Sequence, residues 1–153
     1  MQSQQPLYFE DFAPGQVYRT AAVRVDADAI KRFAREFDPQ PLHLDEQAAA
    51  KGFFGGLTSS GWHTAALTMQ LIVLKGVPVA GGTIGAGVDE LRWPQPVRPG
   101  DSLHLQMEIL EMRPSRSRPT IGLVKMRTTT LNQNDEPVQI MVANLVVPRR
   151  GAG

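Results

Sequence analysis

The sequence predicts an α+β fold in which one long buried helix is wrapped by a curved antiparallel sheet. Three observations lead to this fold class. The chain has 153 residues, a length typical of one domain. An apolar helical segment lies just before its midpoint, and four strand-like segments follow that helix. Because no repeat or linker interrupts the chain, we expect one domain over residues 1–153 with its core at about 9–147.

The first third of the chain alternates between a strand and short helices. Residues 17–25 alternate loosely and predict a strand. Asp26 is expected to cap a helix that ends before Pro39 and Pro41, because a proline lacks an N–H and disfavours a helical residue before it. A second, short helix is predicted over residues 45–51, capped by its aspartate and stopped by a following glycine.

The segment 59–75 predicts the central helix. Its apolar residues cover nearly the whole circumference, which is typical of a buried helix. The strands that should wrap it are rich in Val, Ile, Leu and Thr and are bounded by turn residues. They are expected at residues 83–93, 102–112, 119–132 and 137–147.

Composition narrows the function classes. Sixteen basic and fifteen acidic residues are interspersed, which excludes the electrostatic pattern of a nucleic-acid-binding protein. The chain has no cysteine, so it has neither disulfides nor a thiolate metal site. Residues 1–6 do not resemble a signal peptide, and no apolar run approaches the roughly 20 residues of a membrane span. We expect a cytoplasmic enzyme or binding domain.

Asp38 and His43 are the strongest candidates for chemistry. They flank a loop that Pro39 and Pro41 stiffen, so a carboxylate and an imidazole can face the same small molecule. The spacing alone is equally compatible with a structural pair, in which Asp38 accepts backbone N–H bonds after a helix and His43 is a satisfied loop residue. A metal site is not favoured, because His43 with Asp38 and Asp45 lacks a clear ligand spacing.

Ser60 and Gly61 open the central helix and form the second candidate. The first N–H groups of a helix have no intrahelical acceptor and stabilise negative charge. Gly61 lacks a Cβ, so a substrate carbonyl could approach its N–H closely. The alternative is an ordinary N-cap serine followed by a glycine that permits close packing.

Two neighbouring side chains and one distant histidine complete the candidates. Trp62 is interpreted as core or pocket wall. His63 lies in the first helical turn, where a cation is disfavoured, so a neutral structural role and a pocket role both stay open. His104 lies on the polar face of an alternating strand and is interpreted as a surface residue.

One ordered set of motifs runs through residues 33–45, then Ala48-Ala49-Ala50, Gly55-Gly56-Leu57 and Ser60-Gly61, and later through residues 92–97 and Gly100-Asp101. This set resembles the MaoC-like dehydratases, which include the (R)-specific enoyl-CoA hydratases. It covers nearly the whole chain, from about Phe9 to Val147.

This resemblance implies a hot-dog fold, usually paired into a homodimer, and a hydro-lyase of fatty acid metabolism that acts on acyl-CoA thioesters. It implies Asp38 and His43 as the catalytic dyad and the Gly61 N–H as donor to the thioester oxygen. Coenzyme A would enter as part of the substrate, with no cofactor. The sequence departs from the family at Gln40, where Asn is usual, and at Ser60-Gly61 with Trp62-His63. These departures bear on substrate binding.

Two rival functions stay open. Hot-dog thioesterases often place Glu or Asp on the central helix, yet residues 59–75 contain no acidic residue. A non-catalytic acyl-CoA-binding protein is the second rival. Arg92, Arg98 and Arg116 could contact CoA phosphates, but scattered arginines are more often plain surface residues.

Overall fold

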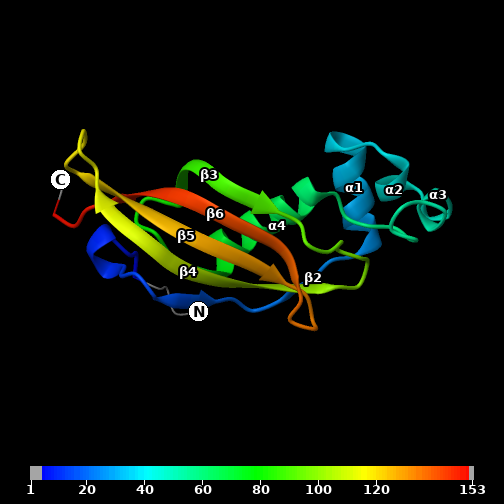
Figure 1. Cartoon of the computed structure of the whole chain (residues 1–153), viewed down its shortest axis with the longest axis horizontal. Helices are drawn as coiled ribbons and strands as arrows, with labels where there is room; N and C mark the ends of the chain where they lie inside the picture. Colours follow the sequence, from blue (N-terminus) through cyan, green and yellow to red (C-terminus); the bar gives the residue numbers. More distant parts are fainter. Residues whose placement is uncertain (1–4, 152–153) are drawn as a thin grey trace.

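Six strands form one antiparallel sheet in the computed structural model, which describes residues 5–151. The order is β1-β4-β5-β6-β3, with β2 also paired to β4 (Figure 1). Strands β4, β5 and β6 follow one another as hairpins, whereas β3 pairs with β6 and not with β4. The expected antiparallel sheet and α+β fold class are confirmed. The bounds are β1 Val17–Arg19, β2 Val23–Arg24, β3 Ile84–Arg92, β4 Ser102–Pro114, β5 Ile121–Leu131 and β6 Pro137–Pro148.

The strand predicted over residues 17–25 is two short strands. β1 pairs with β4 opposite Glu108 to Gln106, and β2 pairs opposite Leu103 and Ser102. Between them, the Thr20 hydroxyl accepts the Leu105 N–H at 3.0 Å. A side-chain oxygen thus replaces a ladder carbonyl, and the chain leaves regular strand geometry there.

Helix α4 (Gly61–Lys75) lies against the concave face of the sheet (Figure 1). Its Leu71 and Ile72 enter the main core with Leu105, Met107 and Val124 of the strands. The expectation that the helix is buried all round is wrong for this chain. One sheet covers one side of a helix, so four large apolar residues stay exposed at 40–71%: Trp62, Met69, Val73 and Leu74.

Four short helical elements precede α4: η1 (Phe9–Asp11), α1 (Ala27–Phe37), α2 (Pro41–Leu44) and α3 (Glu46–Ala50). Helices α1 to α3 gather beyond one end of the sheet, next to the start of α4 (Figure 1). A second core joins them to the sheet through Ile30, Ala49 and Leu103. This arrangement brings the 38–43 segment to the N-terminus of α4.

Within residues 5–151, no helix is both long enough and apolar enough to cross a membrane. The expectation that the first six residues are not a signal peptide falls mostly on residues 1–4, which lie outside the described part of the chain. Residues 152–153, the end of the expected single domain, also lie outside it.

Candidate active site

Asp38 is placed by the end of helix α1. The helix begins at Asp26, whose carboxylate accepts the Ala29 N–H at 2.7 Å, and its last backbone bond runs from Asp38 N–H to the Ala34 carbonyl at 2.9 Å. Asp38 itself leaves the helix with φ −151° and ψ 69°, a non-helical conformation, as expected before a proline, which disfavours a helical residue ahead of it. Its side chain therefore points off the helix end, where it is 18% exposed.

His43 faces Asp38 from the next turn of chain. It lies in α2, which starts at Pro41, a favoured first helical residue. The His43 Nδ1 lies 2.6 Å from the Thr58 carbonyl oxygen. Because a carbonyl only accepts, Nδ1 must carry a proton, which leaves the lone pair of the neutral ring on Nε2. That Nε2 lies 3.4 Å from Asp38 Oδ2.

Three neighbouring side chains favour the ionised form of Asp38. Burial raises the pKa of the Asp38 carboxyl, but hydrogen bonds from Gln40 and Ser60 and the charge of His43 together hold this pKa below its usual range. The Gln40 amide reaches back to Asp38 Oδ1 at 2.6 Å. When the His43 ring is in its neutral form, the ionised Asp38 and the His43 Nε2 present two proton acceptors side by side.

Ser60 links this pair to the start of α4. It is 1% exposed, its oxygen accepts the Trp62 N–H at 3.3 Å as the N-cap, and its hydroxyl lies near enough to Asp38 to lower the pKa of that carboxyl. The next residue, Gly61, is the first of the helix, so its N–H points out of the helix end without an intrahelical acceptor. Ser60 is thus both a cap and a partner of the carboxylate.

His43 and Gly61 line the same cavity, which has a volume of about 410 Å³. Phe53, Phe54, Trp93 and other mostly apolar residues complete its walls. A small-molecule pocket of this size, largely apolar with few convergent polar groups, is typical of a ligand site. His43 and the N-terminus of α4 thus meet at one cavity, and Asp38 lies behind His43, outside the cavity lining.

Two candidates from the first turn of α4 lie away from it. Trp62 is 60% exposed and is not a core residue, because its side of the helix faces away from the sheet. His63 is buried against α1, stacked on Phe33 with ring centroids 4.9 Å apart and bonded to Ser59 Oγ at 2.8 Å. Burial, helped by the charge of Arg32, lowers the pKa of His63, so this ring is neutral.

The remaining candidates also have structural partners. The His104 Nε2 lies 3.2 Å from Asp135 Oδ1 on the outer face of the sheet. Arg98 donates to the Phe54 carbonyl at 2.7 Å, and Arg92 pairs with Glu90. Within residues 5–151, no cluster of three or more His, Asp or Glu side chains is arranged to hold a metal ion.

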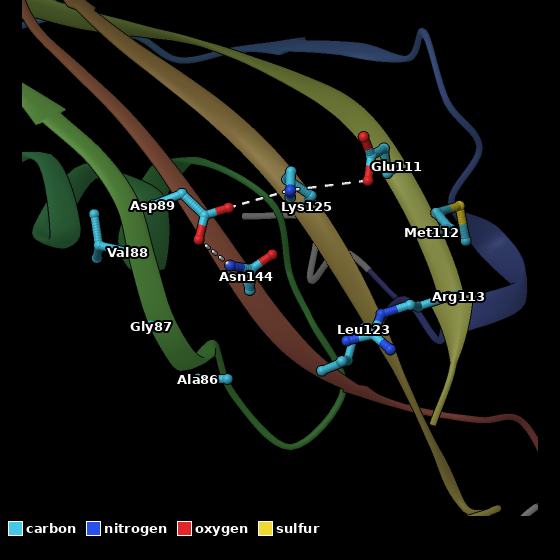
Figure 2. A pocket seen from close by; sticks show the side chains of 10 residues that line it. All are labelled: Ala86, Gly87, Val88, Asp89, Glu111, Met112, Arg113, Leu123, Lys125 and Asn144. Atoms are coloured by element: carbon cyan, nitrogen blue, oxygen red, sulfur yellow. Dashed lines mark hydrogen bonds and ion pairs between the residues drawn. The ribbon is translucent and has the colours of Figure 1, made fainter. Parts of the chain in front are cut away.

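A larger hollow, of about 520 Å³, lies on the opposite face of the sheet. Figure 2 shows Lys125 of β5 between Asp89 of β3 and Glu111 of β4, with Asn144 beside Asp89. The Lys125 amine lies 3.1 Å from Asp89, and Asn144 donates to Asp89 at 3.0 Å. These exposed charges satisfy one another across neighbouring strands, so the hollow is a solvated sheet face and not a reaction centre.

A family model described as the MaoC-like domain matches residues 10–131, which include the dyad and the start of α4. The chain belongs to the MaoC-like family. A solved MaoC-like dehydratase from Rhodospirillum rubrum is 55% identical, covering 94% of this chain and 98% of that one, with a TM-score of 0.91. This likeness confirms the resemblance and the hot-dog fold expected from the sequence motifs.

Two curated relatives extend the comparison of this MaoC-like chain. The uncharacterized protein YdeM of Bacillus subtilis is 35% identical and is matched over 84% of this chain and 90% of its own length. The 3-hydroxybutyryl-CoA dehydratase of Methylorubrum extorquens is 28% identical, over 94% and 86% of the two chains. Hydratases and dehydratases thus occur in the family.

The MaoC-like site also contains residues that sequence reasoning missed. Thr58 orients His43 through its backbone carbonyl, and a backbone contact has no residue-type signal in a sequence. Trp93 walls the cavity, although its motif had been noted only as part of the resemblance. The available signal for Trp93 was a large aromatic residue at a strand end directly before a proline.

Proposed function

We propose that this MaoC-like protein is an (R)-specific enoyl-CoA hydratase, which reversibly adds water to a trans-2-enoyl thioester. In reverse it is a 3-hydroxyacyl-CoA dehydratase. The observation that carries the proposal is the pairing of Asp38 Oδ2 with His43 Nε2, 3.4 Å apart, where His43 lines a cavity that Gly61 also lines. Acid/base groups beside a free helix N–H are what this reaction needs.

The electrophile is activated at Gly61. Adding water to C3 of a 2-enoyl thioester moves electrons from the C2–C3 double bond onto the carbonyl oxygen, giving an enolate. The Gly61 N–H, backed by the dipole of α4, donates to that oxygen as its negative charge develops. The donor is fixed in a helix, so little reorganisation accompanies the reaction.

The proton moves through the dyad. A water held between Asp38 and the His43 Nε2 loses a proton as its oxygen bonds to C3. The protonated dyad then returns a proton to C2, which restores the carbonyl and completes the addition of H and OH. The Thr58 carbonyl keeps Nδ1 protonated throughout and stabilises the charged ring when Nε2 holds the second proton.

The test is hydration of crotonyl-CoA by the wild type and dyad variants. We expect Asp38→Asn and His43→Gln each to lower turnover by about 10²–10⁴-fold while the folded structure is kept. His104→Gln is the matched control, because this histidine also pairs with an aspartate but lies on the outer sheet face. The product should be the (R)-3-hydroxyacyl thioester. Folded dyad variants with wild-type turnover would remove the proposal.

The same assay separates the rivals. A thioesterase would release free thiol from an acyl-CoA, but α4 carries no carboxylate that could serve that reaction. Tight binding of acyl-CoA esters with no turnover across a panel would favour a non-catalytic binding protein.

The protein is also proposed to act as a homodimer. Strand β3 ends the sheet, and its Ile84 and Val88 are more than half exposed, next to the uncovered apolar side of α4. An unpaired edge strand beside exposed apolar residues favours association with a second copy.

A further inference from the structure

Trp93 closes the cavity at the end of β3. Its indole packs so tightly on Gly61 that a Cβ at position 61 would lie 2.6 Å from the ring. Such a contact is too short for any residue with a side chain, so only glycine lets the indole lie there. Trp62 braces the same ring from outside, edge to face, with centroids 5.3 Å apart.

A buried polar chain anchors Trp93 to the sheet. Its Nε1 donates to Gln139 Oε1 at 2.9 Å, and Gln139 Nε2 donates to Thr68 Oγ1 at 3.2 Å. Thr68 and Thr130 share a hydroxyl bond of 2.6 Å, and Thr130 lies directly opposite Gln139 in the β5–β6 ladder. Gln139, Thr68 and Thr130 are fully buried. Moving Trp93 would leave the Gln139 carbonyl unpaired, which is costly in a buried site.

These contacts limit the space that is available to an acyl chain. Trp93 lines the cavity, whereas the polar chain lies behind it between α4 and the sheet. A longer acyl tail directed that way would have to displace the indole and enter a hydrogen-bonded polar cluster. The volume of about 410 Å³ must also admit the end of the pantetheine arm, so little length remains for the acyl group.

We propose that Trp93, positioned by Gln139, is the specificity-determining wall that restricts this enzyme to short-chain 2-enoyl thioesters. The inference rests on the proposed hydratase function and adds the substrate class. Trp93 contacts the substrate tail, and Gln139 acts only through Trp93.

The experiment compares kcat/KM for trans-2-octenoyl-CoA and crotonyl-CoA in the wild type and in Trp93→Leu. The wild type should favour crotonyl-CoA, and Trp93→Leu should raise the octenoyl-to-crotonyl ratio by about tenfold or more, the discrimination expected of one or more methylenes in a pocket. His104→Gln is the control, because His104 lies beside Asp135 on the outer face of the sheet, away from Trp93, and this variant should keep the wild-type ratio.

Two further variants keep the test decisive if Trp93→Leu does not fold. Trp93→Phe keeps a ring but loses the Nε1 donor, and Gln139→Met removes the anchor, so both should shift the ratio in the same direction as Trp93→Leu. The proposed role of Trp93 would be wrong if the wild type hydrated both esters equally well. It would also be wrong if folded Trp93 and Gln139 variants kept the wild-type octenoyl-to-crotonyl ratio of kcat/KM. Absence of hydration of either ester by the wild type would instead overturn the hydratase function on which the wall depends.

Discussion

At the scale of single residues, Gln40 is the departure from the family pattern with a visible consequence. The longer glutamine arm folds back on Asp38 and donates to Oδ1, while Ser60 donates from the start of α4. These donors outweigh the burial that would otherwise raise the pKa of Asp38. Gln40 thus keeps the carboxylate available as a proton acceptor in mildly acidic solution.

Replacing Gln40 should therefore change the pH dependence of hydration. In Gln40→Leu the stabilised carboxylate loses a donor, so the pKa of Asp38 rises, and the part of the acidic limb of the kcat/KM profile that reports protonation of Asp38 should move to higher pH. The sign follows because hydration needs the ionised form, which exists only above this pKa. The measurement is kcat/KM against pH for crotonyl-CoA.

The control is Gln47→Leu, an exposed glutamine of α3 whose side chain makes no hydrogen bond within residues 5–151. An acidic limb that stays in place in Gln40→Leu would mean that Gln40 does not tune the base.

At the scale of elements, the inward row of β5 carries two buried threonines with opposite situations. Thr130 shares a hydrogen bond with Thr68 of α4, while the Thr128 hydroxyl is buried without a hydrogen-bond partner in the described structure. A buried hydroxyl with a hydrogen-bond partner stabilises the contact between helix and sheet. A buried hydroxyl without a partner has given up its hydrogen bonds to water and gained none in the protein, which lowers the stability of the fold.

Valine substitutions at these two positions should have opposite effects, although valine matches the shape of threonine. Thr128→Val should raise the free energy of unfolding by about 1 kcal/mol, because it removes an unpaired polar group. Thr130→Val should lower it by about 1 kcal/mol, because it leaves the Thr68 hydroxyl with one partner fewer. Urea unfolding at one fixed protein concentration measures both, and destabilisation by Thr128→Val would show that its hydroxyl has a partner in solution.

At the scale of the whole molecule, the apolar surface is concentrated on one side. Met69, Val73 and Leu74 of α4 and Ile84 and Val88 of β3 are all at least 40% exposed. Between helix and strand lies an apolar hollow of about 200 Å³ that Met69 and Val88 both line. A second copy over this side would bury the apolar residues and cover the edge of β3.

A charged side chain on the apolar side formed by α4 and β3 should prevent the proposed homodimer from forming. Val88→Lys would place an ammonium in the buried interface, so we expect sedimentation velocity to show a dimer for the wild type and a monomer for the variant. Val17→Lys is the matched control, since Val17 is a 42% exposed valine of β1 at the opposite edge of the sheet. A monomeric wild type at micromolar concentration would contradict the homodimer.

The sequence determined the fold class and the main elements because those features depend on local patterns. The alternation of apolar and polar residues predicted β4. Asp26 and Asp45 predicted the starts of α1 and α3, and the prolines at 39 and 41 predicted the end of α1. The ordered motifs also indicated the dyad and the helix start as one site. The break between β1 and β2 escaped prediction, because it depends on a Thr20 bond to a strand 85 residues away.

The sequence by itself therefore determined which residues are the candidates for the proposed chemistry, since residue type and order along the chain are enough to indicate an acid/base pair and a glycine at a helix start. Only the tertiary structure decided how those residues are tuned. The Thr58 carbonyl fixes the His43 tautomer, Ser60 joins the carboxylate to α4, and Trp93 closes the cavity from the end of β3. Each of these contacts joins segments distant in sequence, and their distances and angles arise only when the sheet and helices pack together.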